Sequence, residues 1–130
     1  MIDINVIAAS VADELREYKA FVSFAPELSL ASLETEKCIV VPVGYEDTAV
    51  SRNSCTVECQ IEIGFLKRGK SLDINALTLE VRNIAKKFLH KKYCGTTCFK
   101  IQNKVLVDPD TLRERNQFSS VIVLFFKGVE

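Results

Sequence analysis

Residues Phe118–Lys127 read FSSVIVLFFK, a run that contains six consecutive apolar side chains. Three of the six are β-branched, which favours a strand over a helix. A strand without polar residues on either face has to be covered on both sides. The run is also too short to cross a bilayer as a helix. We therefore expect it to form a strand in the middle of a sheet.

The composition indicates one domain, residues 1–130, with balanced charge. Of its residues 48% are hydrophobic, enough for a substantial core. Seventeen basic and seventeen acidic residues cancel, which argues against a surface directed as a whole to nucleic acid or to an anionic membrane. Zero net charge also leaves little repulsion between copies. The start, Met1–Asn5, lacks the pattern of a signal peptide, so we expect the protein to stay in the compartment where it is made, with no membrane partner.

The chain has five cysteines, an odd number. In a chain that is not secreted, free and mostly buried thiols are the expected state. Cys55 and Cys59 fall in a predicted strand, where residues four apart lie roughly 13 Å from each other, too far to share one metal ion. Cys94 and Cys98 also lack the two-residue gap of common zinc sites. We expect no metal and no cofactor.

The first third of the chain predicts one helix followed by extended segments. Asp3 is a suitable N-cap, and apolar residues then recur every three or four positions as far as about Lys19. Residues Phe21–Leu33 are expected to be extended, with a short strand first and a bend at Pro26. Cys38–Val43 has the composition of a strand.

The next segments predict a loop and a long strand. Pro42 indicates a sheet edge or the end of pairing, because proline lacks the amide donor. Gly44–Ser54 has no periodicity and many turn formers, so we expect a long exposed loop that binds a partner. Cys55–Phe65 alternates apolar and polar residues, the pattern of a strand with one wet face.

A second helix is expected after a cap at Ser71 or Asp73, with an apolar stripe from Ile74 to Leu89. Positive charge gathers in its predicted last turns, where the helix dipole favours it. Helix capping and solvation explain these residues, and nucleic-acid contact is the alternative explanation. The basic residues in this group are Lys86, Lys87, Lys91 and Lys92, with His90 among them.

The last third of the chain completes an α+β pattern. Cys98–Gln102 and Val105–Val107 predict one strand or two, and Asp108–Arg115 a helical turn or a tight loop. The element order predicts a four- to five-stranded, mostly antiparallel sheet with two main helices packed on one face. Two helices leave the other face bare, so we expect a second copy of the chain to cover it.

No group of residues has the pattern of an active site. The single histidine, His90, has no serine or cysteine placed for activation, and no two carboxylates share an apolar setting. Glycines are isolated, so no phosphate-binding loop is expected. We predict that the chain is not an enzyme. A small ligand-binding domain remains an alternative and would require a pocket with convergent polar groups.

Several segments together resemble the tail terminator, or tail completion and neck, proteins of long-tailed bacteriophages and prophages. This likeness is one of hydrophobic positions over nearly the whole chain, and the cysteines are not part of it. The segments that carry it are Phe24–Leu28, Cys38–Val43 with the following Ser51-Arg52, the strand Val57–Leu66, the helix Leu77–Leu89, Asp108–Leu112 and Phe118–Lys127.

The resemblance implies a virion protein that is assembled in the host cytoplasm. It implies a homo-oligomeric ring, typically a hexamer, which ends tail tube polymerisation at the head-proximal end of the tube. The implied partners are the tail tube protein and the head connector or neck protein. A neck adaptor that touches nucleic acid through the basic helix end is the related alternative. The residues we expect at subunit or tube contacts are Tyr45, Glu46, Asp47, Arg52, Arg113, Glu114 and Arg115.

Overall fold

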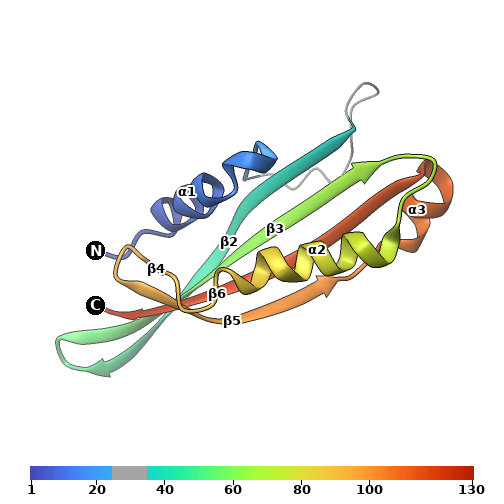
Figure 1. Cartoon of the computed structure of the whole chain (residues 1–130). Coiled ribbons are helices and arrows are strands. Elements are labelled where there is room, and N and C mark those ends of the chain that lie inside the picture. Colours follow the sequence, from blue (N-terminus) through green and yellow to red (C-terminus); the bar gives the residue numbers. More distant parts are fainter. Residues whose placement is uncertain (25–34) are drawn as a thin grey trace.

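A computed structural model describes residues 1–24 and 35–130 of the chain. In this part of the chain, six strands form one sheet in the order β1-β2-β3-β6-β5-β4 (Figure 1). β1 runs parallel to β2, and every other neighbouring pair is antiparallel. The strands are β1 (Phe21–Val22), β2 (Glu36–Ser51), β3 (Ser54–Arg68), β4 (Lys92–Tyr93), β5 (Thr96–Val105) and β6 (Gln117–Val129). The helices are α1 (Ile4–Glu14), the short 3-10 helix η1 (Arg16–Tyr18), α2 (Ile74–Lys86) and α3 (Pro109–Arg115).

The apolar run at the end of the chain forms β6, which lies between β3 and β5 as predicted. Its alternate residues Phe118, Ile122 and Phe126 point into the main core and are almost fully buried. The core continues into the apolar face of β3, whose predicted alternation is confirmed: Val57, Cys59, Ile61 and Ile63 are buried. The buried face of β3 and β6 therefore forms the centre of the core.

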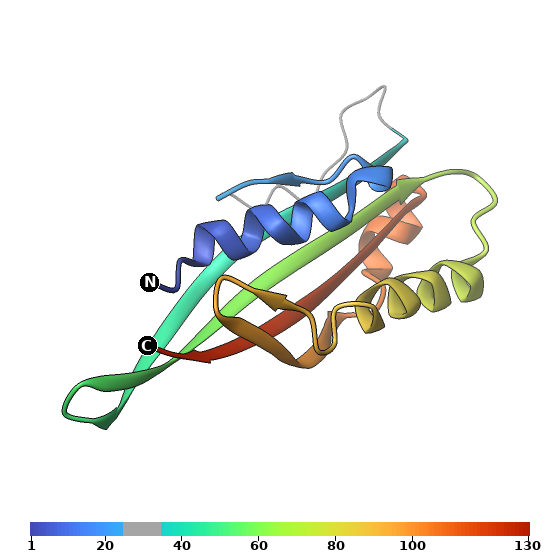
Figure 2. The same ribbon diagram turned by 60° about the vertical axis from the view of Figure 1, so that its left-hand side comes forward.

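The two longer helices lie on the same face of the sheet (Figure 2). α1 packs on β2 and α2 on β6, each through a stripe of small and branched apolar residues. Both predicted caps are present: the carboxylate of Asp3 accepts a hydrogen bond from the amide of Asn5, and that of Asp73 accepts one from the amide of Ala76. Each bond satisfies a backbone donor that the first turn of a helix leaves free.

The predicted helix ends were too late in the chain. α1 ends at Glu14, and the single turn of η1 carries the chain on to Tyr18. α2 ends at Lys86, and the amides of Lys87, Phe88 and Leu89 each donate to the carbonyl three residues earlier. His90 then takes a left-handed conformation (φ 70°) and donates its amide hydrogen bond to the carbonyl of Cys98. This hydrogen bond joins the turn at His90 to β5, and the chain continues beside β5 as the short strand β4, which was not predicted.

The prediction of a loop over Gly44–Ser54 was wrong. β2 continues to Ser51 and pairs with β3 almost to the hairpin turn at Arg52 and Asn53. Pairing also continues past Pro42, which faces Ile61, with a register shift just beyond it. Proline is tolerated there because no described strand lies on the outer side of β2 at this position. In this outer β2–β3 hairpin (residues 44–60), the β2 half from Tyr45 to Ser51 is exposed on both faces, so no apolar alternation marks it as a strand.

The predicted fold class is confirmed as α+β with a mainly antiparallel sheet, but two details differ. The sheet has six strands in the described residues instead of four or five, because β1 and β4 add two residues each. The segment Asp108–Arg115 forms a seven-residue helix, α3, capped by the carboxylate of Asp108 with proline in the first turn. β5 is a single strand. Of the segment Phe21–Leu33, which was predicted to be extended, Phe21 and Val22 form β1, and residues 25–33 lie outside the described residues.

The second face of β6 is covered by its own chain, which corrects our expectation that another copy must cover it. Val121, Val123 and Phe125 retain only 7%, 6% and 9% of their exposure. Part of this cover comes from β5: the ring of Phe99 packs on Phe125 (centroids 6.3 Å apart), and Lys100 lies over the same ring at 4.9 Å. Aliphatic and aromatic parts of neighbouring side chains can shield an apolar surface in this way.

Candidate functional site

The structure separates the predicted contact residues into two groups. Tyr45, Glu46 and Asp47 lie on the outer part of β2, and Arg52 lies in the hairpin turn. Arg113, Glu114 and Arg115 lie on α3. Figure 1 shows the hairpin and α3 at opposite ends of the long sheet. One binding site cannot include both groups, whereas a subunit with contacts at both ends can use each.

The predicted lysine cluster does not form one continuous surface on a helix. Lys86 is the last residue of α2 and Lys87 is its C-cap, but Lys91 and Lys92 follow the left-handed turn. The ammonium of Lys91 lies 3.7 Å from a carboxylate oxygen of Glu14 on α1, a surface ion pair.

Both sides of the sheet have long unpaired edges. β1 pairs with β2 only at Ile39 and Val40, so no described strand pairs with the outer side of β2 from Val41 to Ser51. On the other side β4 pairs with β5 only at Thr96 and Thr97, and two backbone hydrogen bonds extend this cover to Cys98. The outer side of β5 therefore has no described partner strand from there to Val105. Such edges offer free amide and carbonyl groups to another strand.

A groove of about 660 Å³ lies between α2 and β5. The groove exists because α2 packs on β6 and does not cover this part of the neighbouring strand, β5, on the helix-bearing face of the sheet. Leu79 and Leu106, 59% and 58% exposed, stand at its rim. The two charged residues among its described lining are both basic, Arg82 and Lys86. The full lining is Asn75, Thr78, Leu79, Arg82, Ala85, Lys86, Leu89, Ile101, Gln102, Asn103, Leu106 and Ile122.

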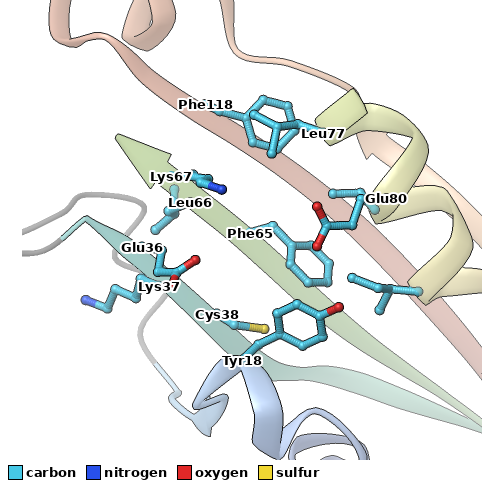
Figure 3. Close-up of a pocket in the computed structure, with 12 residues that line it drawn as sticks. Tyr18, Glu36, Lys37, Cys38, Phe65, Leu66, Lys67, Leu77, Glu80 and Phe118 are labelled. Atoms are coloured by element: carbon cyan, nitrogen blue, oxygen red, sulfur yellow. The ribbon is translucent and has the colours of Figure 1, made fainter. Parts of the chain in front are cut away.

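A smaller pocket of about 60 Å³ opens where α1 and α2 diverge over β2 and β3. Figure 3 shows the ring of Tyr18 and the carboxylate of Glu80 on opposite sides of Phe65, with the thiol of Cys38 beside the tyrosine ring. Tyr18 packs edge-on against Phe65, with ring centroids 6.5 Å apart. Burial, helped by Glu17 and Glu80, raises the pKa of Tyr18, so its hydroxyl stays protonated at neutral pH. The space suits a few water molecules and is too small for a metabolite.

All five thiols are free, as predicted. Burial raises the pKa of Cys38 to about 12 and, with a smaller contribution from Asp47, that of Cys59 to about 11. Thiols of this kind are protonated at neutral pH and behave as small apolar side chains. In the described part of the chain, no three histidine, cysteine or acidic side chains gather as metal ligands would.

Comparison with known proteins gives no family assignment: no family model matches the chain, and no curated protein matches it. Among residues 1–24 and 35–130, no helix is both long and apolar enough to span a membrane.

Sequence reasoning missed the groove and the open edge of β5, whereas Pro42 had indicated the edge of β2. One signal was present: Leu79 is an apolar residue outside the buried stripe of α2, and Leu106 comes directly after β5. Apolar side chains that do not fit the stripe of their element are the sequence signature of an exposed patch. The β5 edge gave no such signal, because which strands end a sheet depends on strand order.

Proposed function

We propose that this chain is a structural subunit that assembles head to tail into a closed ring, and that the ring is a phage tail terminator which ends the tail tube and joins it to the head. The two unpaired edges, on opposite sides of one sheet, are the observation that carries the ring. The resemblance to tail terminator proteins carries the rest, including a copy number of six.

The strand directions suit head-to-tail pairing. β2, β3, β6 and β5 alternate in direction across the sheet, so β2 and β5 point in opposite directions. When the β2 edge of one copy lies beside the β5 edge of the next, the new pair is antiparallel. Each copy then offers both halves of the same contact, and such heterologous contacts close into rings when the rotation allows it.

The two ends of the subunit suit two different neighbours. The tip of the outer hairpin, with Arg52 in its turn, extends past the last pair of β3 and β6, Thr56 with Val129. α3 lies at the other end with the charged residues Arg113, Glu114 and Arg115. A ring of such subunits presents one set of groups toward the tail tube and the other toward the head connector.

The test is electron microscopy of the purified chain, alone and added to polymerising tail tube protein from the same genome. We expect rings alone, and rings at one end of tubes that stop growing. Rings that never attach to tubes would contradict the tail role and leave the ring itself standing. The absence of rings at every concentration would contradict the proposal as a whole. The substitution Arg52→Glu is expected to reduce assembly or attachment.

A further inference from the structure

The groove between α2 and β5 and the outer hairpin have complementary properties. The groove has apolar residues along it and the two cations Arg82 and Lys86, and no carboxylate is among its described lining. The hairpin carries Glu46 and Asp47 beside exposed Tyr45 (66%). Within the described residues, none of these four charged groups has an ion-pair partner.

We propose that the groove is the docking site for the outer β2–β3 hairpin of the next copy in the ring, with Asp47 of that copy against Arg82 and Lys86. This inference rests on the proposed ring and names the contact that closes it. The occupant is a second copy because the matching acidic and apolar segment is present on the same chain.

The strand faces make this contact possible. Asp47 pairs in register with buried Val57, so it projects on the face that the helices cover. On β5, Ile101 pairs with buried Leu124 and projects on that same face, where it lines the groove. If β2 of the next copy extends the sheet beyond β5, its side chains on this face enter the groove beside α2. This contact requires that the hairpin be displaced along β5 from the level of Thr96, which β4 covers, toward Ile101, and tilted strands in a closed sheet are staggered in this manner.

The opposite face supports the same pairing. Glu46 faces Glu58 directly across the hairpin, and two like charges in that position destabilise a strand pair. At the β5 edge, the corresponding face carries exposed Lys100. A neighbouring β5 would therefore bring a cation to the side of the hairpin where two carboxylates repel each other. Acidic groups on both faces of one edge meet basic groups on both faces of the other.

Two charge-reversed variants test the contact. One chain carries Asp47→Arg, and the other carries Arg82→Glu with Lys86→Glu. Each alone is expected to weaken ring formation by about tenfold or more, because like charges then meet in the contact. An equal mixture is expected to restore rings in which the two variants alternate, because every contact again joins opposite charges. Multi-angle light scattering measures the mass in each case.

The controls are Glu17→Arg for the hairpin variant and Lys87→Glu for the groove variant, each a charge reversal outside both surfaces. They are expected to form rings as the original chain does, and thermal unfolding checks that all variants fold. If the original chain forms rings but the reversed variants do so equally well, or the mixture fails to restore them, the docking site is wrong and the ring stands. A chain that stays monomeric at all concentrations overturns both proposals.

Discussion

At the scale of single residues, Gly128 on β6 lies close to Gly95, in the turn before β5. A Cβ built there would lie 2.5 Å from the carbonyl oxygen of Gly95 and 2.9 Å from a side-chain carbon of Ile2. The first of these neighbours is backbone and cannot rotate away. A side chain of any size therefore has to displace the chain.

We expect Gly128→Ala to lower the free energy of unfolding by about 1–3 kcal/mol, the usual cost of overpacking. Gly44→Ala is the matched control, because nothing lies within 4 Å of a Cβ at that strand position. Urea denaturation of both variants measures the difference. Equal stability of the two would contradict the close approach at Gly128.

The buried thiol of Cys38 predicts a pH dependence of stability. Its pKa is about 12 in the folded chain and near 9 when unfolded, so the unfolded state loses its proton first as the pH rises. Stability from this group is complete below about pH 9 and is lost between pH 9 and 12. We expect Cys38→Val, which cannot titrate, to reduce the fall in unfolding free energy over that range. An unchanged slope in Cys38→Val would show that other groups account for it.

At the scale of elements, sequence patterns predicted the helices and strands that have one face buried in the core. The alternation in β3 and the stripes of α1 and α2 were readable because each has one buried face. The outer hairpin was not readable, because residues exposed on both faces keep no period of two. β1 and β4 are too short for any pattern, and backbone hydrogen bonds to their neighbours define them.

The hairpin provides a test at this scale. Because Glu46 faces Glu58, we expect Glu46→Gln to raise the free energy of unfolding by up to about 1 kcal/mol, measured at a concentration where the chain is monomeric. The same substitution also removes a charge proposed to face the next copy, so ring formation should weaken.

Glu36→Gln is the matched control for that experiment. Glu36 is on the same strand, but its partner in register is Lys67, an opposite charge. The control should leave stability unchanged or lower it. If Glu46→Gln lowered stability as well, the proposed repulsion within the hairpin would be wrong.

At the scale of the whole molecule, the sequence predicted one α+β domain with β6 in its centre. Pro42 indicated the edge at β2, but the sequence did not reveal the open edge of β5 or the groove beside α2. The apolar second face of β6 suggested a partner, but side chains of β5 contribute to covering it. Among the described residues, the open surfaces are instead the two strand edges and the groove beside α2, which depend on strand order and on where a helix packs. These features depend on the tertiary structure of the folded chain, so the local sequence pattern of each element gives little indication of them.

The charged contacts predict that the ring responds to salt. Exposed ion pairs weaken as the ionic strength rises, because the Debye length falls from about 10 Å at 0.1 M to about 3 Å at 1 M. We expect the dissociation constant of the ring to be larger in 1 M salt than in 0.1 M salt, as measured by sedimentation velocity over a range of protein concentrations. Strand pairing and apolar contacts are less sensitive, so a ring unaffected by salt would leave those contacts as its main support.

The most direct measurement is the mass of the purified chain by size-exclusion chromatography with multi-angle light scattering, over a range of concentrations. One copy has a mass of 14.6 kDa. We predict a discrete closed assembly, and for the six copies implied by the family likeness a mass of six times that value, about 88 kDa. A single 14.6 kDa species at every concentration would contradict the account, because both strand edges would then be open in the working form of the protein.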